Sequence, residues 1–339
     1  MRLEAVLGID VPVVQGPFGG DLSTVALAAA VSSAGGLGSY GAHLLAPERI
    51  TALVAELRAA TARPFAVNLW VPQPDEDVLP TEEDVARVRP YLRELGLPDP
   101  DTTGPLLPDF DAQLDALLAA APPVISFVMG LPPAAAVAEA RARGIVTIGT
   151  ATTPAEAVAV EAAGLDVVVA SGSDAGGHRG AFLRPVAESL VGTFSLVPQV
   201  VDAVGIPVIA AGGIADARGV AAARALGADG VQVGTGFLAT AESGASAAHK
   251  AALHGPGAEV TVLTRAFTGR TARAQLNRLV AELADAPVPP YPAQSALLLD
   301  LRRAAGAAGD ADLINLWSGQ AAALTAPRTA REYLELLTG

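Results

Sequence analysis

Short apolar runs alternate with Ala-rich helical patterns along most of the chain. Each run ends in a polar or Gly-rich turn that usually leads into a helix, which is typical of a parallel sheet with helical crossovers. The alternation recurs eight times and favours closure into a (β/α)8 TIM barrel. An open doubly wound sheet is the alternative, although no G-x-G-x-x-G follows the first run. The predicted strands are Pro12–Gln15, Gly36–Tyr40, Phe65–Trp70, Val124–Val128, Ile145–Thr150, Val167–Ser171, Val208–Ala211 and Val231–Gly234.

The helix after the fifth strand has clear start and stop signals. Thr153 precedes Pro154, an N-cap residue followed by proline at the first helical position. The run AEAVAVEAAG then ends on Gly164, a common C-terminal stop. A helix is also predicted to begin near Asp216, after the seventh strand.

Two segments do not fit the repeat. Residues 71–112 are rich in Pro, Asp and Glu and lengthen the connection after the third strand, and residues 239–298 follow the eighth strand. Long insertions beyond the carboxyl end of a strand usually act as lids or substrate pockets. We therefore expect a barrel over residues 1–238, a small lid or substrate domain over 239–298, and C-terminal helices over 299–339 that return to the barrel.

The C-terminal part is predicted to contain two helices, near Ala293–Ala305 and Thr329–Leu337. The sequence Trp317-Ser318-Gly319-Gln320 lies between them. We expect Trp317 to pack between these helices, with a return of this piece to the barrel mouth as the alternative.

Composition and charge narrow the class of protein. Of the 339 residues, 51% are hydrophobic but only 4% are aromatic, so small aliphatic side chains build a core suited to helices on a buried parallel sheet. The formal net charge of −13 disfavours binding to nucleic acid or an anionic membrane. The absence of cysteine excludes disulfides, thiolate zinc sites and Cys nucleophiles. The chain starts without a signal-peptide pattern and has no apolar run long enough to span a membrane, so a cytoplasmic protein is expected.

Glycines follow the seventh and eighth strands. The two loops read Ala210-Ala211-Gly212-Gly213-Ile214 and Gln232-Val233-Gly234-Thr235-Gly236. In a barrel these loops commonly form a phosphate site, because glycine lets backbone N–H groups approach an anion. The Thr235 hydroxyl can add a donor. Ordinary turn chemistry also places glycine in such loops, and it remains the alternative.

The loop after the sixth strand contains a candidate catalytic residue. It reads Ser171-Gly172-Ser173-Asp174-Ala175-Gly176-Gly177-His178-Arg179-Gly180. A loop so rich in glycine is a poor place to bury a structural imidazole, and imidazole exchanges a proton near neutral pH. The position favours His178 as a general base over a purely structural role.

Polar groups also end the first and third strands. Asn68 could hydrogen-bond a ring amide or carbonyl at the barrel mouth, or cap its own loop. The backbone of Gln15-Gly16-Pro17 could lie against a flat ring. A metal site has little support, because His249 and His254 lie five residues apart without a third ligand. A Ser–His–Asp hydrolase is disfavoured because no G-x-S-x-G is present.

Five motifs together resemble the nitronate monooxygenase family, once called 2-nitropropane dioxygenases. They are VVQGPFGG, PFAVNLW, SDAGGHRG, IPVIAAGGI and GVQVGTGFLATAES, and the resemblance covers Val11 to about Arg270, with a looser match through Gln320. It implies an FMN-binding TIM barrel with a small lid, with the flavin at the barrel mouth and His178 as the catalytic residue. The flavin contacts it implies, with those proposed above, are Gln15, Gly16, Asn68, Ser171, Gly176, Gly177, Gly212, Gly213, Gln232, Val233, Gly234 and Thr235.

The chain departs from the family pattern at two positions. Family members often have Gln where Ser171 stands and commonly have Glu where Asp174 stands. Neither change removes the flavin or the base, but both leave the substrate open.

The resemblance implies oxidation of an alkyl nitronate, such as propionate 3-nitronate, by dioxygen to a carbonyl compound and nitrite. His178 would position the nitronate or deprotonate a neutral nitroalkane. The same superfamily holds enoyl-acyl-carrier-protein reductases and NAD(P)H:quinone reductases, so an NAD(P)H-dependent flavin reductase is the alternative. A flavin-binding accessory protein without turnover and a barrel that binds only a sugar phosphate are further alternatives. The expected partners are the nitronate and dioxygen, and the chain is a candidate homodimer.

Overall fold

The computed structural model describes residues 2–339 and contains the predicted barrel. Eight parallel strands pair in the order β1-β9-β8-β6-β5-β4-β3-β2. The sheet closes between β1 and β2, where the Gln15 N–H donates to the Leu37 carbonyl and the Leu37 N–H donates to the Val13 carbonyl, both at 2.9 Å. This closure excludes the open sheet. The barrel strands are β1 (Val13–Gln15), β2 (Gly38–Gly41), β3 (Phe65–Trp70), β4 (Val124–Val128), β5 (Val146–Ala151), β6 (Val167–Ser171), β8 (Val208–Ala211) and β9 (Gly230–Val233).

Alternation of side chains along the strands separates two cores. On β6, Val167 and Val169 face the barrel interior, whereas Val168 and Ala170 face the layer between strands and helices. The interior cluster also contains Leu3 of the short helix α1 (Leu3–Leu7), which covers the amino ends of the strands. A strand buried on both faces therefore reads as a continuous apolar run, which is why these strands could be predicted.

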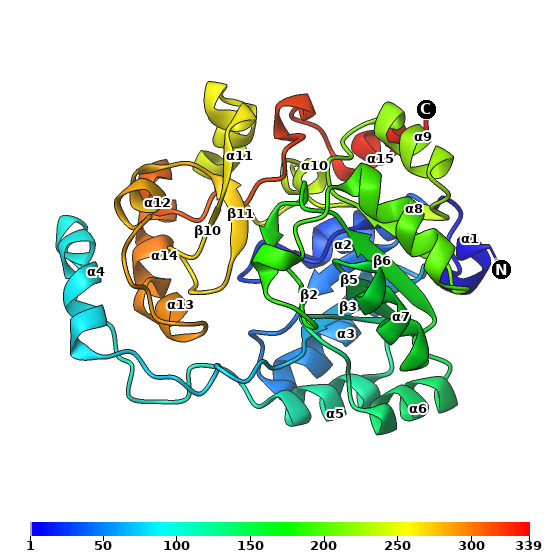
Figure 1. The fold of residues 1–339 in the computed structure, drawn as a ribbon, viewed down its shortest axis with the longest axis horizontal. Coiled ribbons are helices and arrows are strands. Elements are labelled where there is room, and N and C mark those ends of the chain that lie inside the picture. Colours follow the sequence, from blue (N-terminus) through cyan, green and yellow to red (C-terminus); the bar gives the residue numbers. More distant parts are fainter. Residues whose placement is uncertain (1) are drawn as a thin grey trace.

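The outer helices surround the barrel (Figure 1), and α7, α9 and α15 begin where the sequence predicts them. The Thr153 side chain accepts the Glu156 N–H at the start of α7, with Pro154 in the first turn, and Asp216 is the N-cap of α9. The outer helices are α2 (Val25–Ser33), α3 (Pro47–Ala60), α5 (Phe110–Ala120), α6 (Ala134–Ala142), α7 (Pro154–Ala162), α8 (Thr193–Ala203), α9 (Ala217–Ala225), α10 (Thr235–Leu238) and α15 (Ala330–Thr338).

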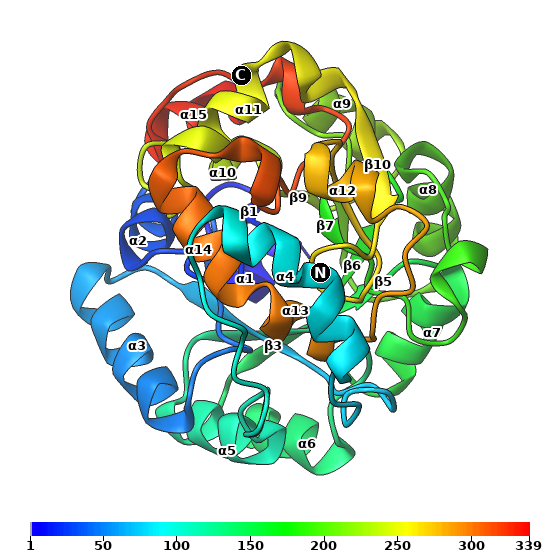
Figure 2. The same cartoon turned by 90° about the vertical axis from the view of Figure 1, so that its left-hand side faces the viewer.

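A second hydrophobic cluster lies apart from the barrel cores and forms the body on the left of Figure 1. It surrounds a small sheet in which β7 (Gly177–His178) extends the hairpin β10–β11. Figure 2 shows helix α4 lying across the outer side of this body. Its elements are α4 (Glu82–Glu94), α11 (Ala247–His254), β10 (Thr261–Thr264), β11 (Ala272–Gln275), α12 (Arg278–Glu282), α13 (Ala293–Leu297) and α14 (Leu299–Ala308).

Three stretches of the chain share this second cluster. Residues 85–92 of α4 come from the insertion after β3, residues 266–298 come from the predicted lid segment, and residues 301–316 lie beyond that segment. An ion pair between Glu76 and Arg270 at 2.6 Å also joins the two insertions. The helix predicted near Ala293–Ala305 is broken at Leu298 into α13 and α14. The division of the chain at residues 238 and 298 stays a prediction.

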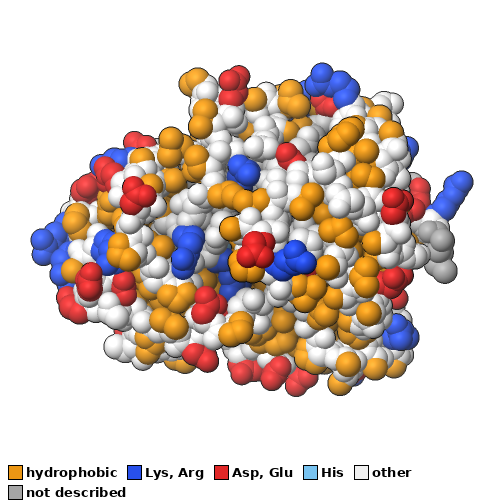
Figure 3. All heavy atoms as spheres, viewed as in Figure 1, with side chains coloured by type: hydrophobic (Ala, Val, Ile, Leu, Met, Phe, Trp, Pro, Cys, Tyr) orange, Lys and Arg blue, Asp and Glu red, His pale blue; other side chains and the backbone are white. Residues whose placement is uncertain are grey.

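None of the helices within residues 2–339 combines the length and apolar character needed to cross a membrane. Over the same residues, no group of three or more His, Asp or Glu side chains is gathered as a metal site would require. On the face shown in Figure 3, basic and acidic side chains are interspersed.

Candidate active site

A cavity of about 1080 Å³ lies between the barrel and the second cluster. Its wall combines loops that follow the barrel strands with parts of α13 and α14. Gln15 and Val233 do not line it: the Gln15 side chain is buried and accepts the Ser39 N–H at 2.8 Å, and Val233 is buried in the barrel wall. The predicted site residues that do line it are Gly16, Asn68, Ser171, Gly176, Gly177, His178, Gly212, Gly213, Gln232, Gly234 and Thr235.

The two glycine loops present backbone donors to this cavity. Gly212 and Gly213 have φ values of +111° and +71°, which favour glycine. Within residues 2–339, the N–H groups of Gly213, Ile214 and Gly234 have no hydrogen-bond acceptor. Successive free N–H groups in such a turn make a concave site for an anion. The donor set fits a phosphate group.

The C-terminal segment returns to these loops, so the expectation that Trp317 packs between the C-terminal helices is wrong. Trp317 instead forms a β-bridge with Ala274 of β11, beyond the end of the short strand β7, and lines the cavity. The Gly319 N–H then donates to the Thr235 hydroxyl oxygen at 2.9 Å. Strand β7 is only two residues long and pairs with Ala272 and Arg273, so the backbone of Ala274 and Gln275 on that side of β11 is free to pair with this segment. No local pattern in the segment indicates this pairing.

The loop that carries His178 is held by charged side chains. The buried Arg179 guanidinium donates to the carbonyls of Gly172 and Ser171, each at 2.7 Å. Asp174 accepts the N–H and the hydroxyl of Thr193 at 2.6 and 2.7 Å. Burial raises the pKa of Asp174, but these hydrogen bonds outweigh it and the pKa is lowered. The loop is therefore ordered independently of the His178 imidazole.

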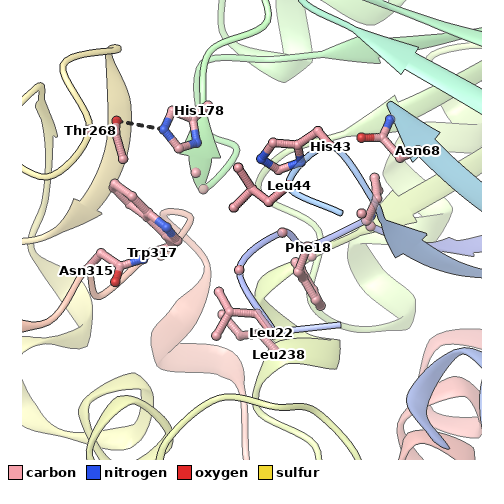
Figure 4. A pocket seen from close by; sticks show the side chains of 18 of the residues that line it. Phe18, Leu22, His43, Leu44, Asn68, His178, Leu238, Thr268, Asn315 and Trp317 are labelled. Carbon is pink, nitrogen blue, oxygen red and sulfur yellow. Dashed lines mark hydrogen bonds between the residues drawn. The ribbon is translucent and has the colours of Figure 1, made fainter. Parts of the chain in front are cut away.

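His178 lies on β7, paired with Ala272 of β11, so the barrel loop and the second cluster hold it together. Its Nε2 atom lies 2.9 Å from the Thr268 hydroxyl (Figure 4). That hydroxyl donates its proton to the Arg270 carbonyl at 3.2 Å, so it accepts from an Nε2–H. This tautomer leaves Nδ1 as the basic nitrogen, and Nδ1 makes no hydrogen bond with the described residues.

The surroundings of His178 keep its imidazole neutral. Burial, followed by the nearby charge of Arg270, lowers the pKa of His178 well below 6.5. A neutral imidazole with a free ring nitrogen can accept a proton at neutral pH.

Aromatic residues surround His178, and of these the sequence reasoning considered only Trp317, as an alternative. The Trp70 ring meets the His178 ring edge-on at 4.8 Å, stacks on His43 at 3.8 Å and lies 5.5 Å from Tyr291. Trp317 lies 5.0 Å from His178 on another side. Trp70 stands two positions after Asn68 on β3, so the alternation along that strand could have placed both at the same wall. The sequence around His43 and Tyr291 contains no pattern that indicates their position beside Trp70.

The Asn68 side chain bonds to the neighbouring strand and does not cap its own loop. Its Nδ2 donates to the Ser126 carbonyl at 3.1 Å and to the Ser126 hydroxyl at 3.0 Å, which ties β3 to β4. Its Oδ1 makes no hydrogen bond within residues 2–339, and Asn68 lines the cavity. An acceptor is therefore left for a ring N–H.

Comparison with known proteins assigns this arrangement to a family. The family model described as "Nitronate monooxygenase" matches residues 1–339. A curated protein of Staphylococcus aureus (strain Newman), "Probable nitronate monooxygenase", is 40% identical over 333 residues, covering 97% of this chain and 94% of the relative. The chain belongs to the nitronate monooxygenase family. Its membership makes it an oxidoreductase and supports a function in nitronate oxidation.

The solved structures similar to this chain include a nitroalkane oxidase and a protein named FabK. The nitroalkane oxidase from Streptomyces ansochromogenes is 41% identical with a TM-score of 0.92, covering 99% of this chain and 96% of that one. FabK from Thermotoga maritima is 31% identical with a TM-score of 0.77, covering 99% and 94%. The resemblance and the TIM barrel predicted from the sequence are confirmed.

Because two of its histidines are buried, we expect the folded protein to lose stability as the pH falls. Burial lowers the pKa of His43 to about 3, and burial likewise lowers that of His249 to about 4. Below pH 6.5 the unfolded chain binds these protons and the folded chain does not, so the free energy of unfolding falls as the pH falls. Each histidine contributes a slope of about 1.4 kcal/mol per pH unit between its unfolded and folded pKa values.

Urea denaturation between about pH 6.5 and 4.5 measures this slope. In His249→Gln the amide can still donate to the Trp317 carbonyl, which His249 Nε2 meets at 3.0 Å, but the side chain no longer titrates. We expect a slope smaller by about 1.4 kcal/mol per pH unit than in the wild type. An unchanged slope would show that His249 does not titrate differently on unfolding.

Proposed function

We propose that this protein uses FMN to oxidise alkyl nitronates, such as propionate 3-nitronate, with dioxygen, yielding a carbonyl compound and nitrite. One observation carries the proposal: the glycine cradle and a neutral His178 line the same cavity. A phosphate-binding cradle beside a proton acceptor fits a phosphate-bearing cofactor next to an ionisable substrate.

The residues that would hold the cofactor divide into two groups. The N–H groups of Gly213, Ile214 and Gly234, with the Thr235 hydroxyl, would bind the phosphate. Gly16 and the free Oδ1 of Asn68 would contact the ring. FMN supplies an electron acceptor for the nitronate and a site of reaction with dioxygen. The chain's contribution is binding, orientation and the exclusion of water.

His178 would act on the substrate, and its neighbours would set its position. The neutral imidazole would accept a carbon-bound proton at Nδ1, and the N–H so formed would hold the resulting nitronate. Thr268 fixes the ring through Nε2, and Trp70 and Trp317 flank it. These aromatic rings limit water around the base. We also propose that residues 239–298 and the insertion 71–112 cover the site as a lid.

Nitrite release tests this proposal. The purified protein, with its flavin content measured, is mixed in air with pre-ionised propyl 1-nitronate and with propionate 3-nitronate. We expect nitrite to accumulate together with dioxygen consumption, without any nicotinamide cofactor. A flavin-containing preparation that releases no nitrite from either compound would contradict the proposal.

The second candidate is an NAD(P)H-dependent flavin reductase of enoyl thioesters or quinones. The similarity to FabK, at 31% identity over almost the whole chain, is the observation that favours it. Oxidation of NAD(P)H by the purified protein with a quinone or an enoyl thioester, and no nitrite from nitronates, would support this candidate.

The lowered pKa of His178 predicts how proton abstraction depends on pH. The active form of a base is unprotonated, so a lowered pKa keeps the imidazole active at lower pH than 6.5. We expect kcat/KM for a freshly dissolved neutral nitroalkane to stay nearly constant as the pH falls through 6.5. Initial rates between about pH 5 and 8 measure this. A loss of half the activity near pH 6.5, with full flavin content, would assign an ordinary pKa to the base.

A further inference from the structure

One face of helix α14 forms the side of the cavity away from the glycine cradle. Leu299, Arg302 and Gly306 recur at helical spacing and all line the cavity, as does Arg303. The cradle and His178 lie on barrel loops, whereas this face belongs to the second cluster. A ligand that touches both walls must span the cavity.

The histidines in the cavity wall do not supply positive charge at neutral pH. His43, His178 and His249 line the cavity, and burial is the first cause that lowers the pKa of each. The imidazoles are therefore neutral toward a negatively charged ligand. Only the arginines of α14 remain as cations among the described residues that line the cavity.

The two arginines of α14 differ in their surroundings. Arg303 is exposed, and its guanidinium lies 3.8 Å from the Asp300 carboxylate. Arg302 is half-buried and has no carboxylate within 4.0 Å in the part of the chain that the structure describes. Burial lowers the pKa of Arg302 to about 10, which still leaves it positively charged at neutral pH.

The hydrogen bonds of Arg302 leave part of its guanidinium available. Its Nε donates to the Leu298 carbonyl at 3.2 Å, and its Nη2 donates to the Ser295 carbonyl and hydroxyl at 3.0 and 3.1 Å. Its Nη1 makes no hydrogen bond within residues 2–339. The side chain is thus held in place by neutral groups, and a desolvated cation of this kind is stabilised by an incoming anion.

We propose that Arg302 forms an anion subsite that binds a carboxylate at the end of the substrate remote from the nitronate group. The inference rests on the proposed function, in which the nitronate group lies near His178. Under this inference, Arg302 is the residue that makes the enzyme prefer a nitronate with a carboxylate over an alkyl nitronate of the same length.

A pair of matched substrates tests the subsite. Propionate 3-nitronate carries a carboxylate where propyl 1-nitronate carries a methyl group. We expect the wild type to prefer the carboxylate compound, and Arg302→Gln to lose about 10- to 100-fold in kcat/KM for it, as expected for a hydrogen bond to a charged group. The value for propyl 1-nitronate should fall by less than about threefold, since that substrate offers no carboxylate to lose.

Two further variants separate charge from structure. Arg303→Gln removes the same charge from the next position of α14, where the charge is exposed and paired, and the ratio of the two substrates should stay at the wild-type value. Arg302→Lys keeps the charge and should retain part of the preference. It also keeps the proposal testable if Arg302→Gln, which loses the bonds to Leu298 and Ser295, does not fold.

Binding of unreactive analogues gives a readout that does not depend on turnover. Succinate and butyrate have the same chain lengths as the two nitronates, with a carboxylate in place of the nitronate group. Succinate should raise the thermal unfolding midpoint of the purified wild type more than butyrate at equal concentration and ionic strength. Arg302→Gln should abolish this difference, and Arg303→Gln should keep it.

The outcomes distinguish the subsite from the proposed function. Equal losses on both nitronates in Arg302→Gln, or no wild-type preference for the carboxylate compound, would overturn the subsite while nitronate oxidation stands. If neither nitronate releases nitrite, the proposed function fails, and an equal effect of succinate and butyrate would then overturn the subsite as well.

Discussion

Replacing His178 by alanine is expected to lower kcat/KM for a neutral nitroalkane by about 10²- to 10⁴-fold, the usual contribution of a general base. The variant should keep much of its activity on the pre-ionised nitronate of the same compound, because that form has no carbon-bound proton to lose. The basis is a neutral imidazole held through Nε2 by Thr268, with Nδ1 free of partners among residues 2–339. The measurement is kcat/KM on both forms, with FMN occupancy determined for each preparation.

Two other outcomes would assign His178 a different role. Similar losses on both substrate forms would show that the imidazole positions the anion. A fall in flavin content together with activity would show that His178 orders its loop, although Arg179 and Asp174 already hold that loop. Thr268→Val is the matched control, because it removes the hydroxyl that orients the ring and leaves the imidazole in place. For Thr268→Val we expect a smaller loss of kcat/KM on the neutral nitroalkane than for His178→Ala, and unchanged flavin content.

Replacing Gly213 by aspartate is expected to expel FMN from the purified protein. The new carboxylate would stand at the cradle beside Asp174, whose Cβ lies 3.5 Å from where a Cβ at position 213 would be. The new carboxylate would also face the phosphate, and two like charges about 4 Å apart repel by about 4 kcal/mol at an effective dielectric constant near 20. That energy corresponds to about a thousandfold weaker binding of a phosphate. Flavin content after purification, and a titration of the apoprotein with FMN, measure the effect.

The matched variant Gly213→Asn separates charge from shape. Asparagine has the same size as aspartate and tolerates the positive φ of +71° at this position, but it carries no charge. It should retain far more FMN than the aspartate variant. Stoichiometric flavin in Gly213→Asp would refute the assignment of the phosphate to this loop, and equal losses in both variants would indicate a steric cause.

Most of the barrel could be predicted because each strand lies between two apolar layers. Val167–Ser171 and Val208–Ala211 were predicted with their observed bounds, since a continuous apolar run bounded by turn residues is a strong local signal. The glycine loops and His178 follow these strands directly. Their meeting at one cavity is a consequence of the barrel, in which the carboxyl ends of all strands share one face.

The wall opposite the cradle could not be predicted, because long-range packing determines it. Helix α4 joins the second cluster across an insertion whose sequence only indicates a long connection. Trp317 lies beside His178 because β11 extends past the two-residue strand β7 and pairs there with the C-terminal segment, and Thr268 meets His178 from 90 residues away. Arg302 lies within the helix predicted near Ala293–Ala305, yet only the folded cavity shows that it lacks a carboxylate partner among the described residues.

Anaerobic mixing tests the central claim, FMN-dependent oxidation of nitronates, most directly. The flavin-loaded protein is mixed without dioxygen with propionate 3-nitronate in one experiment and with NADH or NADPH in another, while the visible absorbance of the flavin is followed. We predict rapid loss of this absorbance with the nitronate, little change with either nicotinamide cofactor, and recovery with nitrite release when dioxygen is admitted. Rapid loss with NADH or NADPH and none with the nitronate would contradict the account and identify a reductase.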